Sequence, residues 1–370
     1  MVSHVAVLGC GNGGLATSAH LAMKGFTIAL FEHPRFAKNI VHIKEKRGIE
    51  VTGTIEGMAE INLVTTEISQ AIEKAEVIIV VVPAFAQSAF FELMLPHLKK
   101  GQTIILNPGN HGALELYRRL IQQRIQGKVL VAETASLIYA CIRDKVASVR
   151  IDAIKKVMPI SAIPSIRNSE LIDLVKELYS QFILAKNVLE TSFSNFNFIL
   201  HPTTTILNSG WIESTNGNFD FYRLGMSKSV CRILEKLDAE RKKVGRVLKL
   251  DLISTAELFD FFYGIKGKDI FSLVQKSPIH GGYGPSAPNN LFHRYVTEDV
   301  PFGLVPLSSF GKLTGVPTKL TNAVIRIACS LNNTDYNAVG RTAEKLGLAN
   351  FSLEKISKYV TEGAKIPFFK

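Results

Sequence analysis

The chain has 370 residues, of which 46% are hydrophobic and 20% are charged. This length predicts two or three domains, each large enough to bury its own core, and the composition excludes a disordered, collagen-like or disulfide-built protein. The net charge of +11 is spread over the chain, because residues 1–190 carry 21 basic and 17 acidic side chains out of totals of 43 and 32. An even positive field of this kind favours a small anionic ligand over nucleic acid.

The N-terminus begins directly with a strand-like pattern and lacks the basic, apolar and cleavage regions of a signal peptide. The longest apolar stretch, residues 77–83, is far shorter than the ~20 residues that a membrane-spanning helix needs. The four cysteines, at positions 10, 141, 231 and 329, show neither a metal-ligand spacing nor a disulfide framework. We therefore expect a cytoplasmic protein with buried free thiols, no membrane anchor and no metal.

Residues 1–190 alternate short β-branched runs with helical patterns, which is typical of a parallel sheet flanked by helices. Strands are predicted at residues 5–8, 27–31, 77–82, 103–106 and 129–131, and helices at 13–23, 69–74, 85–98 and 113–123. Strand-like segments at 146–151 and 156–160, and a helix at 169–181, are assigned to the remainder of the same sheet. Right-handed crossovers then predict a doubly wound α/β Rossmann domain.

A glycine-rich turn joins the first predicted strand to the first predicted helix. The sequence Gly9-Cys-Gly11-Asn12-Gly13-Gly14 matches the pattern GxGxxG. In such a motif the first glycine permits a tight turn, the second lets the backbone approach a pyrophosphate, and the third lets the helix pack closely on the strand. The amides at the helix N-terminus then face the phosphates. The motif therefore predicts a dinucleotide site formed by Gly9, Gly11, Asn12, Gly13 and Gly14.

The next strand ends at Glu32, 18 residues after the last glycine of the motif. A carboxylate at this position accepts hydrogen bonds from the adenosine ribose and repels a 2′-phosphate, which favours NAD. Arg35 and Lys38 follow closely and could instead serve a 2′-phosphate, so NADP remains the alternative cofactor. Pro83 and Ala84 end the strand at 77–82 and are expected to hold the backbone near the nicotinamide half of the cofactor.

After residue 190 the strand patterns give way to apolar residues at intervals of three and four, as in segments 229–248 and 320–328. Residues 191–370 are therefore predicted to form an all-α domain that follows the Rossmann domain of residues 1–190. The basic run at 241–243 alternates with acidic residues at helical spacing, which is typical of a solvated helix face. A Gly/Pro-rich stretch at 277–290 interrupts the helices, and a loop of that length is usually functional.

Two polar clusters in the helical half are candidates for chemistry. The first, 195–202, contains His201 and precedes a second polar segment at 208–213, and the other cluster spans 293–306. Histidine titrates near neutral pH and suits proton delivery, and a neighbouring carboxylate fixes its tautomer and stabilises its protonated form. Three other histidines compete for this role, and structural or lid functions are expected of them: His111, His280 and His293.

Taken together, these motifs resemble the opine dehydrogenases, the octopine/nopaline dehydrogenase family, over nearly the whole chain. The segments that carry the resemblance are the glycine motif, Glu133-Thr134 followed by Ala140-Cys141, His201-Pro202, Asp238-Ala-Glu240-Arg241, and the stretch from Gly-Pro-Ser-Ala-Pro to Glu298–Pro306. The resemblance implies reductive condensation, in which an α-amino acid and an α-keto acid form an imine that NAD(P)H reduces to a secondary amine. It also implies a Rossmann domain joined to a helical domain, with substrates bound between them.

On the matching positions, the resemblance implies that His201 is the catalytic acid/base and that Asp299 is its partner. Arg294 lies five residues before this aspartate and would hold an anion, either the cofactor pyrophosphate or a substrate carboxylate. The residues expected to contact the substrate are Glu133, Thr134 and Asn208. The expected partners are an amino acid and an α-keto acid, with a homodimer left open and neither nucleic acid nor membrane expected.

One segment departs from the family pattern. The family usually has a proline and an aromatic residue before Ala-Cys-Arg, whereas residues 133–143 read Glu-Thr-Ala-Ser-Leu-Ile-Tyr-Ala-Cys-Ile-Arg. The inserted Ile142 leaves the identity of the amino acid open. Two alternative functions also stay open: a keto-phosphate or 2-keto acid reductase related to glycerol-3-phosphate dehydrogenase and ketopantoate reductase, which depend on a lysine in the helical domain, and a non-catalytic dinucleotide sensor.

Overall fold

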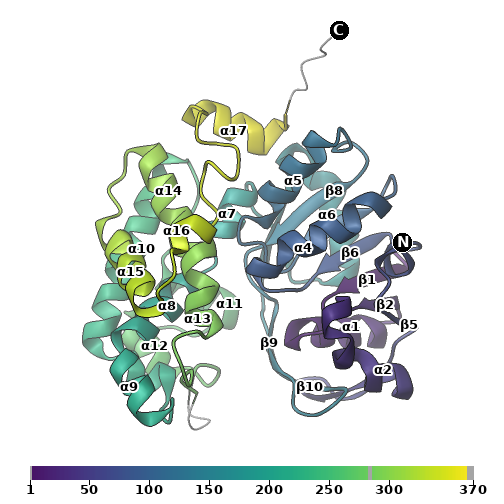
Figure 1. Ribbon diagram of the computed structural model, residues 1–370, viewed down its shortest axis with the longest axis horizontal. Coiled ribbons are helices and arrows are strands. Elements are labelled where there is room, and N and C mark those ends of the chain that lie inside the picture. Colours follow the sequence, from purple (N-terminus) through teal and green to yellow (C-terminus); the bar gives the residue numbers. More distant parts are fainter. Residues whose placement is uncertain (1, 282–285, 365–370) are drawn as a thin grey trace. The chain divides into compact units, whose positions relative to one another are not determined.

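The computed structural model describes residues 2–281 and 286–364, and the chain forms two compact units, Met1–Ser192 with Lys358–Lys370 and Phe193–Ser357 (Figure 1). The first boundary lies two residues from the one expected after residue 190. The end of the chain differs from expectation, because it groups with the first unit. There Tyr359 of α17 (Leu353–Glu362) packs edge-on against Tyr117 at 5.7 Å between ring centroids, and the Tyr117 hydroxyl accepts a hydrogen bond from the Ala364 amide.

The first unit is built on an eight-stranded sheet with the order β12-β11-β8-β7-β6-β1-β2-β5. Its strands are β1 (His4–Leu8), β2 (Thr27–Phe31), β5 (Leu63–Thr65), β6 (Val77–Val80), β7 (Thr103–Leu106), β8 (Leu130–Thr134), β11 (Met158–Ile163) and β12 (Phe182–Leu184). Neighbouring strands are parallel except β8 and β11. The strand order reverses beside β1, and ligands of such sheets bind at the carboxyl ends of the strands at that point.

The helices of this unit explain why the central strands consist of uninterrupted runs of Val and Ile residues. They are α1 (Asn12–Met23), α2 (Val41–Lys46), α3 (Ile68–Ile72), α4 (Ala84–Met94), α5 (Gly112–Gln122), α6 (Asn168–Leu178) and α7 (Val188–Phe193), with short 3₁₀ segments at Pro34–Ile40, Leu95–His97 and Ser165–Arg167. Every residue of β6 and β7 is buried, as expected for parallel strands covered on both faces. The predicted Rossmann architecture is confirmed.

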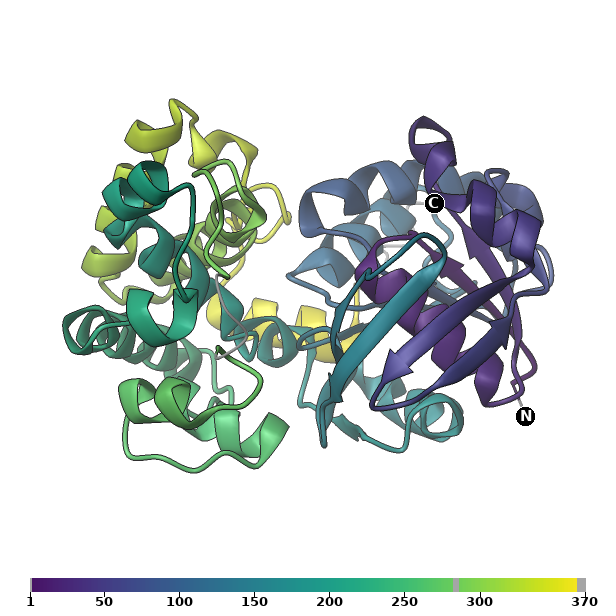
Figure 2. The same ribbon diagram turned by 90° about the horizontal axis from the view of Figure 1, so that it is seen from below.

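A second sheet was not predicted. It has the order β4-β3-β10-β9 and consists of β3 (Gly48–Gly53), β4 (Gly57–Glu60), β9 (Tyr139–Ile142) and β10 (Ser148–Ile154). The assignment of residues 146–151 to the main sheet was therefore wrong, because β10 pairs in parallel with β3, about 100 residues away in sequence. Helix α1 packs between the two sheets, and Figure 2 shows the strands of the small sheet crossing over it.

Lys155 follows β10 and is buried, with its Nζ donating to Ser136 Oγ at 2.9 Å and to the Leu137 carbonyl at 2.6 Å. Burial lowers the pKa of Lys155 from 10.5 to about 7. Between these values the folded protein holds the neutral amine while the unfolded chain holds the ammonium. The unfolded state therefore binds more protons, and this lysine makes the free energy of unfolding rise with pH.

We expect Lys155→Met to remove this dependence. Relative to the variant, the wild-type protein should gain on the order of 1 kcal/mol of stability per pH unit between pH 7.5 and 9.5. Urea denaturation of both proteins at several pH values in this interval measures the difference. A stability difference that does not change with pH would show that Lys155 keeps its charge in the folded protein.

The second unit is helical in the part that the structure describes, which confirms the predicted all-α class. Its helices are α8 (Asn197–Leu207), α9 (Ser209–Thr215), α10 (Lys228–Val247), α11 (Thr255–Tyr263), α12 (Ile270–Lys276), α13 (Arg294–Thr297), α14 (Val305–Thr314), α15 (Lys319–Asn332) and α16 (Tyr336–Val339). Two π-helical turns, Phe221–Gly225 and Val300–Leu304, interrupt this pattern. Of the loop predicted at 277–290, residues 282–285 lie outside the described part of the chain.

One prediction for the basic run on α10 was wrong. Arg241 was predicted on a solvated face, but its side chain is fully buried and forms an ion pair with Asp238 at 2.7 Å. The same guanidinium donates to the carbonyls of Phe193 and Ile253, and Asp238 accepts from the Thr255 amide at 2.9 Å. A buried charge of this kind is tolerated because its donors are satisfied. The motif thus joins three segments of the helical unit.

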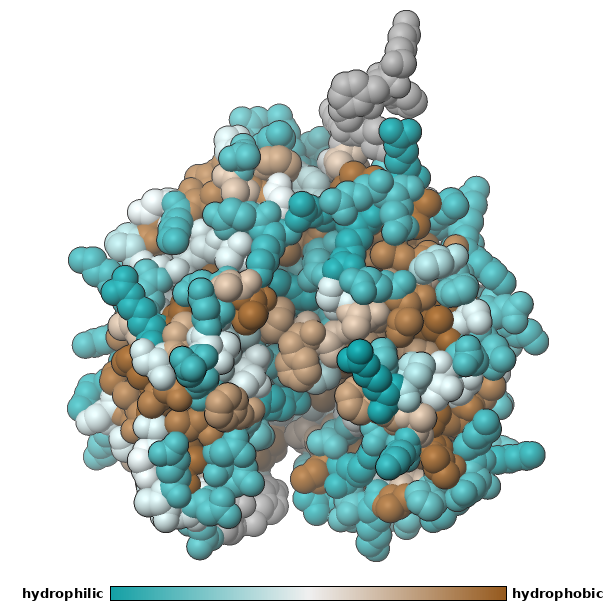
Figure 3. All heavy atoms as spheres, viewed as in Figure 1, coloured by the Kyte–Doolittle hydropathy of each residue, from teal (hydrophilic) through white to brown (hydrophobic). Residues whose placement is uncertain are grey.

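The surface contains both hydrophilic and hydrophobic residues. On the face shown in Figure 3, hydrophilic residues are dispersed and alternate with smaller hydrophobic areas. All four cysteines are free, but Cys141 and Cys329 are only partly buried, unlike Cys10 and Cys231. Over residues 2–281 and 286–364, the structure contains neither a helix with the length and apolarity to cross a membrane nor a group of three metal-ligating side chains.

Candidate active site

The glycine-rich turn has the geometry that dinucleotide binding needs. Gly9 has a φ of +108°, and a Cβ on it would lie 2.5 Å from Val82 Cγ1. A Cβ on Gly14 would lie 1.8 Å from the Gly9 carbonyl oxygen, so that only glycine allows α1 to approach β1 this closely. A Cβ on Gly11 would meet nothing within 4 Å, which leaves the approach to the α1 N-terminus open. The amides of this first turn have no side-chain cap and are available to a phosphate.

The next residues of the motif are supported by neighbouring segments. A Cβ on Gly13 would lie 2.9 Å from Val81 Cγ1 and 3.0 Å from Leu137, so this glycine also allows close packing. Asn12 Oδ1 accepts a hydrogen bond from the Arg143 amide at 3.1 Å, and the Arg143 guanidinium donates to the Cys10 carbonyl. A cationic side chain therefore lies against the turn. The sequence prediction missed this contact, although the family motif Ala-Cys-Arg contained its signal.

Glu32 lies at the end of β2, beside the same turn. Its side chain is buried, and its Oε2 accepts from the Cys10 amide at 3.3 Å and from Asn39 Nδ2 at 3.1 Å. The predicted acidic residue thus lies at the glycine motif. Arg35 is exposed in the 3₁₀ segment that follows, where its amide donates to His33 Nδ1 at 3.1 Å. The Arg35 side chain therefore does not pack into the protein core.

Pro83 and Ala84 lie at the beginning of α4, directly after the strand next to β1. The Val81 amide donates to the Leu8 carbonyl at 2.8 Å and thereby continues the pairing of β6 with β1. The ends of β1, β2 and β6 consequently converge, and they bring together the predicted cofactor residues of the first unit. The residues present fit a dinucleotide, with open space at Gly11, uncapped amides and a carboxylate on one side.

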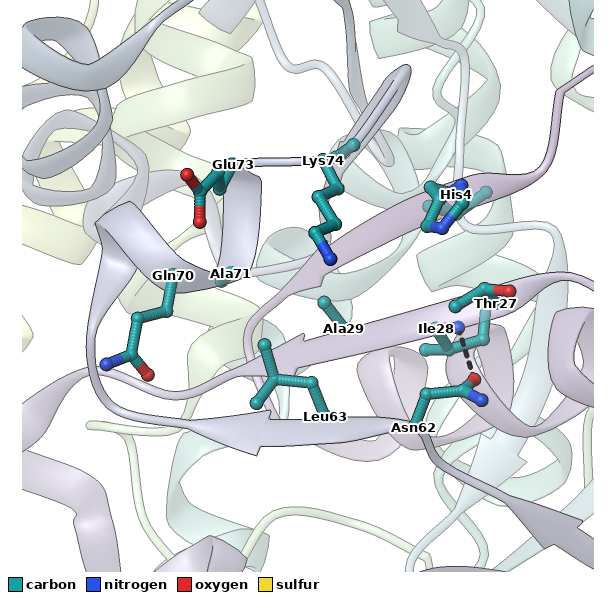
Figure 4. A pocket seen from close by; sticks show the side chains of 12 residues that line it. His4, Thr27, Ile28, Ala29, Asn62, Leu63, Gln70, Ala71, Glu73 and Lys74 are labelled. Atoms are coloured by element: carbon teal, nitrogen blue, oxygen red, sulfur yellow. Dashed lines mark hydrogen bonds between the residues drawn. The ribbon is translucent and has the colours of Figure 1, made fainter.

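A cavity of about 390 Å³ lies at the opposite, amino ends of the strands (Figure 4). It is lined by the first residues of β1, β2 and β5, namely His4, Thr27 and Leu63, and by the end of α3 and the residues after it, including Lys74. None of the predicted site residues lines it. Because dinucleotides bind at the carboxyl ends of such strands, this cavity is not the cofactor site.

Glu133 and Thr134 end β8, as predicted, but both are fully buried. Glu133 Oε1 accepts from Thr191 Oγ1 at 2.9 Å and from Ser192 Oγ, and Oε2 accepts from the Ala113 amide at 3.0 Å. Thr134 Oγ1 lies 3.0 Å from Asn107 Oδ1 and 2.9 Å from the Ser136 carbonyl. The Glu133 carboxylate thus holds α5 and α7 to the end of β8, which is a structural role.

In the helical unit the structure brings His201 and Asp299 together. His201 lies in α8, one residue before Pro202, and its Nδ1 is 2.8 Å from Asp299 Oδ2. Both side chains are buried, with 8% of each residue exposed. A carboxylate that accepts from Nδ1 fixes the tautomer, so that Nε2 is the nitrogen available for proton transfer. The two predicted catalytic residues, 98 positions apart, therefore form one pair.

Two tyrosines complete the surroundings of this histidine, and sequence analysis had not singled them out. His201 Nε2 lies 3.1 Å from the Tyr222 hydroxyl, and the Tyr295 ring stacks on the imidazole with centroids 3.9 Å apart. Tyr222 belongs to the π-helical turn Phe221–Gly225, and such turns are frequent at functional sites. The position of Tyr295 close to Arg294 and Asp299 was the only signal in the sequence.

Arg294 begins α13, and its side chain is 58% exposed. Its Nη2 lies 2.8 Å from Oε2 of Glu298, which is itself buried. The salt bridge engages one terminal nitrogen of the guanidinium, and the exposure of the side chain leaves its other donors for an anion. The predicted anion-binding role of Arg294 is compatible with this position and stays a prediction.

The other candidates occupy supporting positions. His293 caps α13 by accepting from the Tyr295 amide, and burial together with the Arg294 charge lowers the pKa of His293 to about 4. His280 is buried and bonds Ser277 Oγ through Nδ1 at 2.8 Å. His111 occupies the N-cap position of α5 without a side-chain cap, and its amide donates to Ser192 Oγ at 2.7 Å. Asn208 donates to the carbonyls of Thr204 and Gly225. These contacts support the structural roles expected of the histidines.

A Rossmann unit with a glycine-rich turn, in one chain with a helical unit that carries a His–Asp pair, defines an NAD(P)-dependent dehydrogenase. A family model described as NAD-dependent glycerol-3-phosphate dehydrogenase N-terminus matches residues 4–137. A second, described as NAD/NADP octopine/nopaline dehydrogenase, alpha-helical domain, matches residues 184–332. The chain is 35% identical to an opine dehydrogenase of Arthrobacter sp. (strain 1C), over 96% of this chain and 98% of that protein. It therefore belongs to the opine dehydrogenase family.

Two further comparisons agree with this assignment. A D-nopaline dehydrogenase of Agrobacterium vitis is 26% identical over 87% of this chain and 84% of its own. The structure of an octopine dehydrogenase with NADH and L-arginine superposes with a TM-score of 0.78 at 21% identity, covering 98% of this chain and 99% of the other. The fold class is thus shared along the whole chain. The protein is an NAD(P)-dependent oxidoreductase that acts on CH–NH groups, with NAD or NADP as cofactor.

Proposed function

We propose that this enzyme condenses an α-amino acid with an α-keto acid and reduces the product, with His201 as the proton donor and acceptor. The observation that carries the proposal is the His201–Asp299 pair, 2.8 Å apart and buried, in which the carboxylate fixes the tautomer of the imidazole. A bound nicotinamide cofactor supplies the hydride for the reduction. The chain's own residues must then hold two anionic substrates and move protons.

The condensation requires proton transfer, and His201 is the residue that we propose to carry it out. Attack of the amine nitrogen on the keto carbon makes a carbinolamine, and its hydroxyl leaves as water only after it receives a proton. A protonated imidazole is suited to deliver that proton at neutral pH. Asp299 supports this step because it holds the Nδ1 proton and stabilises the positive charge. In the reverse direction the neutral imidazole accepts the proton again.

Arg294 is the residue that we propose to bind an anion. Its guanidinium is exposed, and its planar donors suit a carboxylate or a pyrophosphate. We leave Glu133 and Thr134 out of the proposed substrate contacts, because protein groups already occupy their side chains. The amino acid remains unassigned, and the homodimer expected from the sequence stays a prediction.

The alternative of an alcohol-forming reductase is less well supported. Its relatives share the cofactor domain, as the match over residues 4–137 shows, but the helical domain matches the octopine/nopaline model. The residue that bonds the carboxylate in this domain is a histidine and not a lysine. The histidine pair also argues against a sensor without catalysis.

The test is a matrix of amino acids crossed with pyruvate, 2-oxoglutarate and oxaloacetate, with NADH or NADPH oxidation followed at 340 nm. We expect oxidation only where both substrates are present, and a secondary amine dicarboxylate in the mass spectrum of the product. Oxidation with the keto acid alone would support the alcohol-forming reductase instead. Cofactor binding without turnover in every combination would support the sensor.

A further inference from the structure

Arg143 brings a positive charge to the adenosine side of the glycine-rich turn. It directly follows β9, and its Nη2 donates to the Cys10 carbonyl and lies 3.6 Å from the Cys10 sulfur. Glu32, at the strand end where a carboxylate binds the adenosine ribose, accepts from the amide of the same Cys10 at 3.3 Å. A guanidinium and a carboxylate therefore both contact one residue at the ribose end of the cofactor site.

We propose that Arg143 binds the 2′-phosphate of NADPH and thereby determines how well this enzyme uses NADPH beside NADH. The inference does not rest on the acid role of His201, because cofactor binding is measured without turnover. The sequence indicated Glu32 and Arg35 as the residues of this choice, and the structure adds a residue 133 positions after Cys10.

The charge of Arg143 is not neutralised by the protein. Within residues 2–281 and 286–364, its guanidinium takes part in no ion pair, and its Nε is buried without a hydrogen-bond partner. Burial raises the pKa of the Cys10 thiol to about 12, although the Arg143 charge acts in the opposite direction, so the thiol is uncharged near neutral pH. A half-buried cation without an anion is stabilised by an incoming phosphate, and the planar guanidinium fork suits that ligand.

Glu32 opposes a 2′-phosphate less strongly than a free carboxylate would. Its Oε1 accepts from the His33 amide at 2.8 Å, and its Oε2 accepts from the Cys10 amide and from Asn39 Nδ2 at 3.1 Å. These three donors partly compensate the negative charge that the buried carboxylate presents to a ligand. Attraction by Arg143 and the reduced repulsion by Glu32 then act on the same part of the cofactor.

The segment that carries Arg143 is fixed to helix α1. The Arg143 amide donates to Asn12 Oδ1 at 3.1 Å, and the Tyr139 hydroxyl lies 2.9 Å from His20 Nδ1 on the same helix. A side chain that is held at both its backbone and its Nη2 loses little freedom when it binds an anion. Arg35 is exposed in its 3₁₀ segment, so a phosphate would first have to order its side chain.

The test uses adenosine 2′,5′-bisphosphate and 5′-AMP as probes, because the two differ only in the 2′-phosphate. Isothermal titration calorimetry gives the dissociation constant of each probe for the wild-type enzyme and for Arg143→Gln. We expect Arg143→Gln to weaken the bisphosphate at least about tenfold and 5′-AMP less than about threefold. The KM for NADPH should rise relative to the KM for NADH in the same proportion. Arg143→Lys keeps the charge without the planar fork and should recover part of the loss.

Arg150→Gln is the matched control, because it removes the same charge from the same small sheet, where Arg150 is exposed and paired with Asp152 at 2.8 Å. It should bind both probes as the wild-type enzyme does. Equal weakening of both probes by Arg143→Gln would overturn the proposal and leave Arg143 a structural role at the turn.

Two further results would also overturn it. One is a wild-type enzyme that binds the bisphosphate no more tightly than 5′-AMP. The other is a selective loss of the bisphosphate in Arg35→Gln together with an unchanged Arg143→Gln, which would assign the 2′-phosphate to Arg35. If Arg143→Gln does not fold, Arg143→Met retains the apolar stem of the side chain and is judged by the same ratio of dissociation constants.

Discussion

Replacing His201 by alanine is expected to lower kcat by about 1,000-fold, because general acid catalysis typically contributes between about 100- and 10,000-fold. The substitution removes the group bonded to Asp299 at 2.8 Å and leaves the buried carboxylate without its partner. The glycine motif is in the other unit, so NADH affinity should remain within about twofold. Steady-state kinetics and fluorescence titration with NADH measure these two quantities separately.

His293→Asn provides the matched control for this prediction. Asparagine can keep the cap of α13, in which His293 accepts from the Tyr295 amide, but it removes the imidazole. Activity should stay close to that of the wild-type enzyme, because His293 is neutral at the working pH. If His293→Asn were inactive and His201→Ala active, the catalytic assignment would pass from one histidine to the other.

The second large effect is expected at Gly14. A Cβ at this position would lie 1.8 Å from the Gly9 carbonyl oxygen, and backbone must move to relieve such a contact. We expect Gly14→Ala to lower the free energy of unfolding by more than about 4 kcal/mol, which is exceptional for one methyl group. Chemical denaturation measures it directly.

Gly11→Ala separates folding from cofactor binding. A Cβ at Gly11 meets nothing within 4 Å, and its φ of −79° is ordinary for alanine, so the stability should change by less than about 1 kcal/mol. The methyl group would nevertheless occupy the path by which a pyrophosphate reaches the backbone, and we expect NADH affinity to fall at least about tenfold. Equal NADH affinity in Gly11→Ala and wild type would place the pyrophosphate elsewhere.

The parts of the fold that could be predicted from the sequence are those with local patterns. Strands β1 and β6 and the glycine turn follow from β-branched runs and glycine spacing, which act over a few residues. The small sheet could not be predicted in this way, because β10 pairs with β3 across about 100 residues and each strand is short. Long-range pairing leaves no periodic signal in either strand alone.

The residues of the candidate site also differ in whether a local sequence motif indicated them. His201 and Asp299 were recognised through motifs, and the structure brings them together. Glu133 was expected at the substrate because strand ends often carry function, yet its carboxylate holds Ala113 and Thr191. Tyr222 was missed, since no feature of its neighbours in sequence indicates that its hydroxyl meets a histidine 21 positions earlier.

The hairpin of β9 and β10 reaches the glycine turn from outside the main sheet. It belongs to the small sheet only, yet the residue that follows β9, Arg143, bonds the glycine turn at Cys10. A substitution at Arg143 therefore acts directly on the glycine turn, while the residue itself lies outside the eight-stranded sheet. The turn that the cofactor motif forms thus depends on a segment about 130 residues away in sequence.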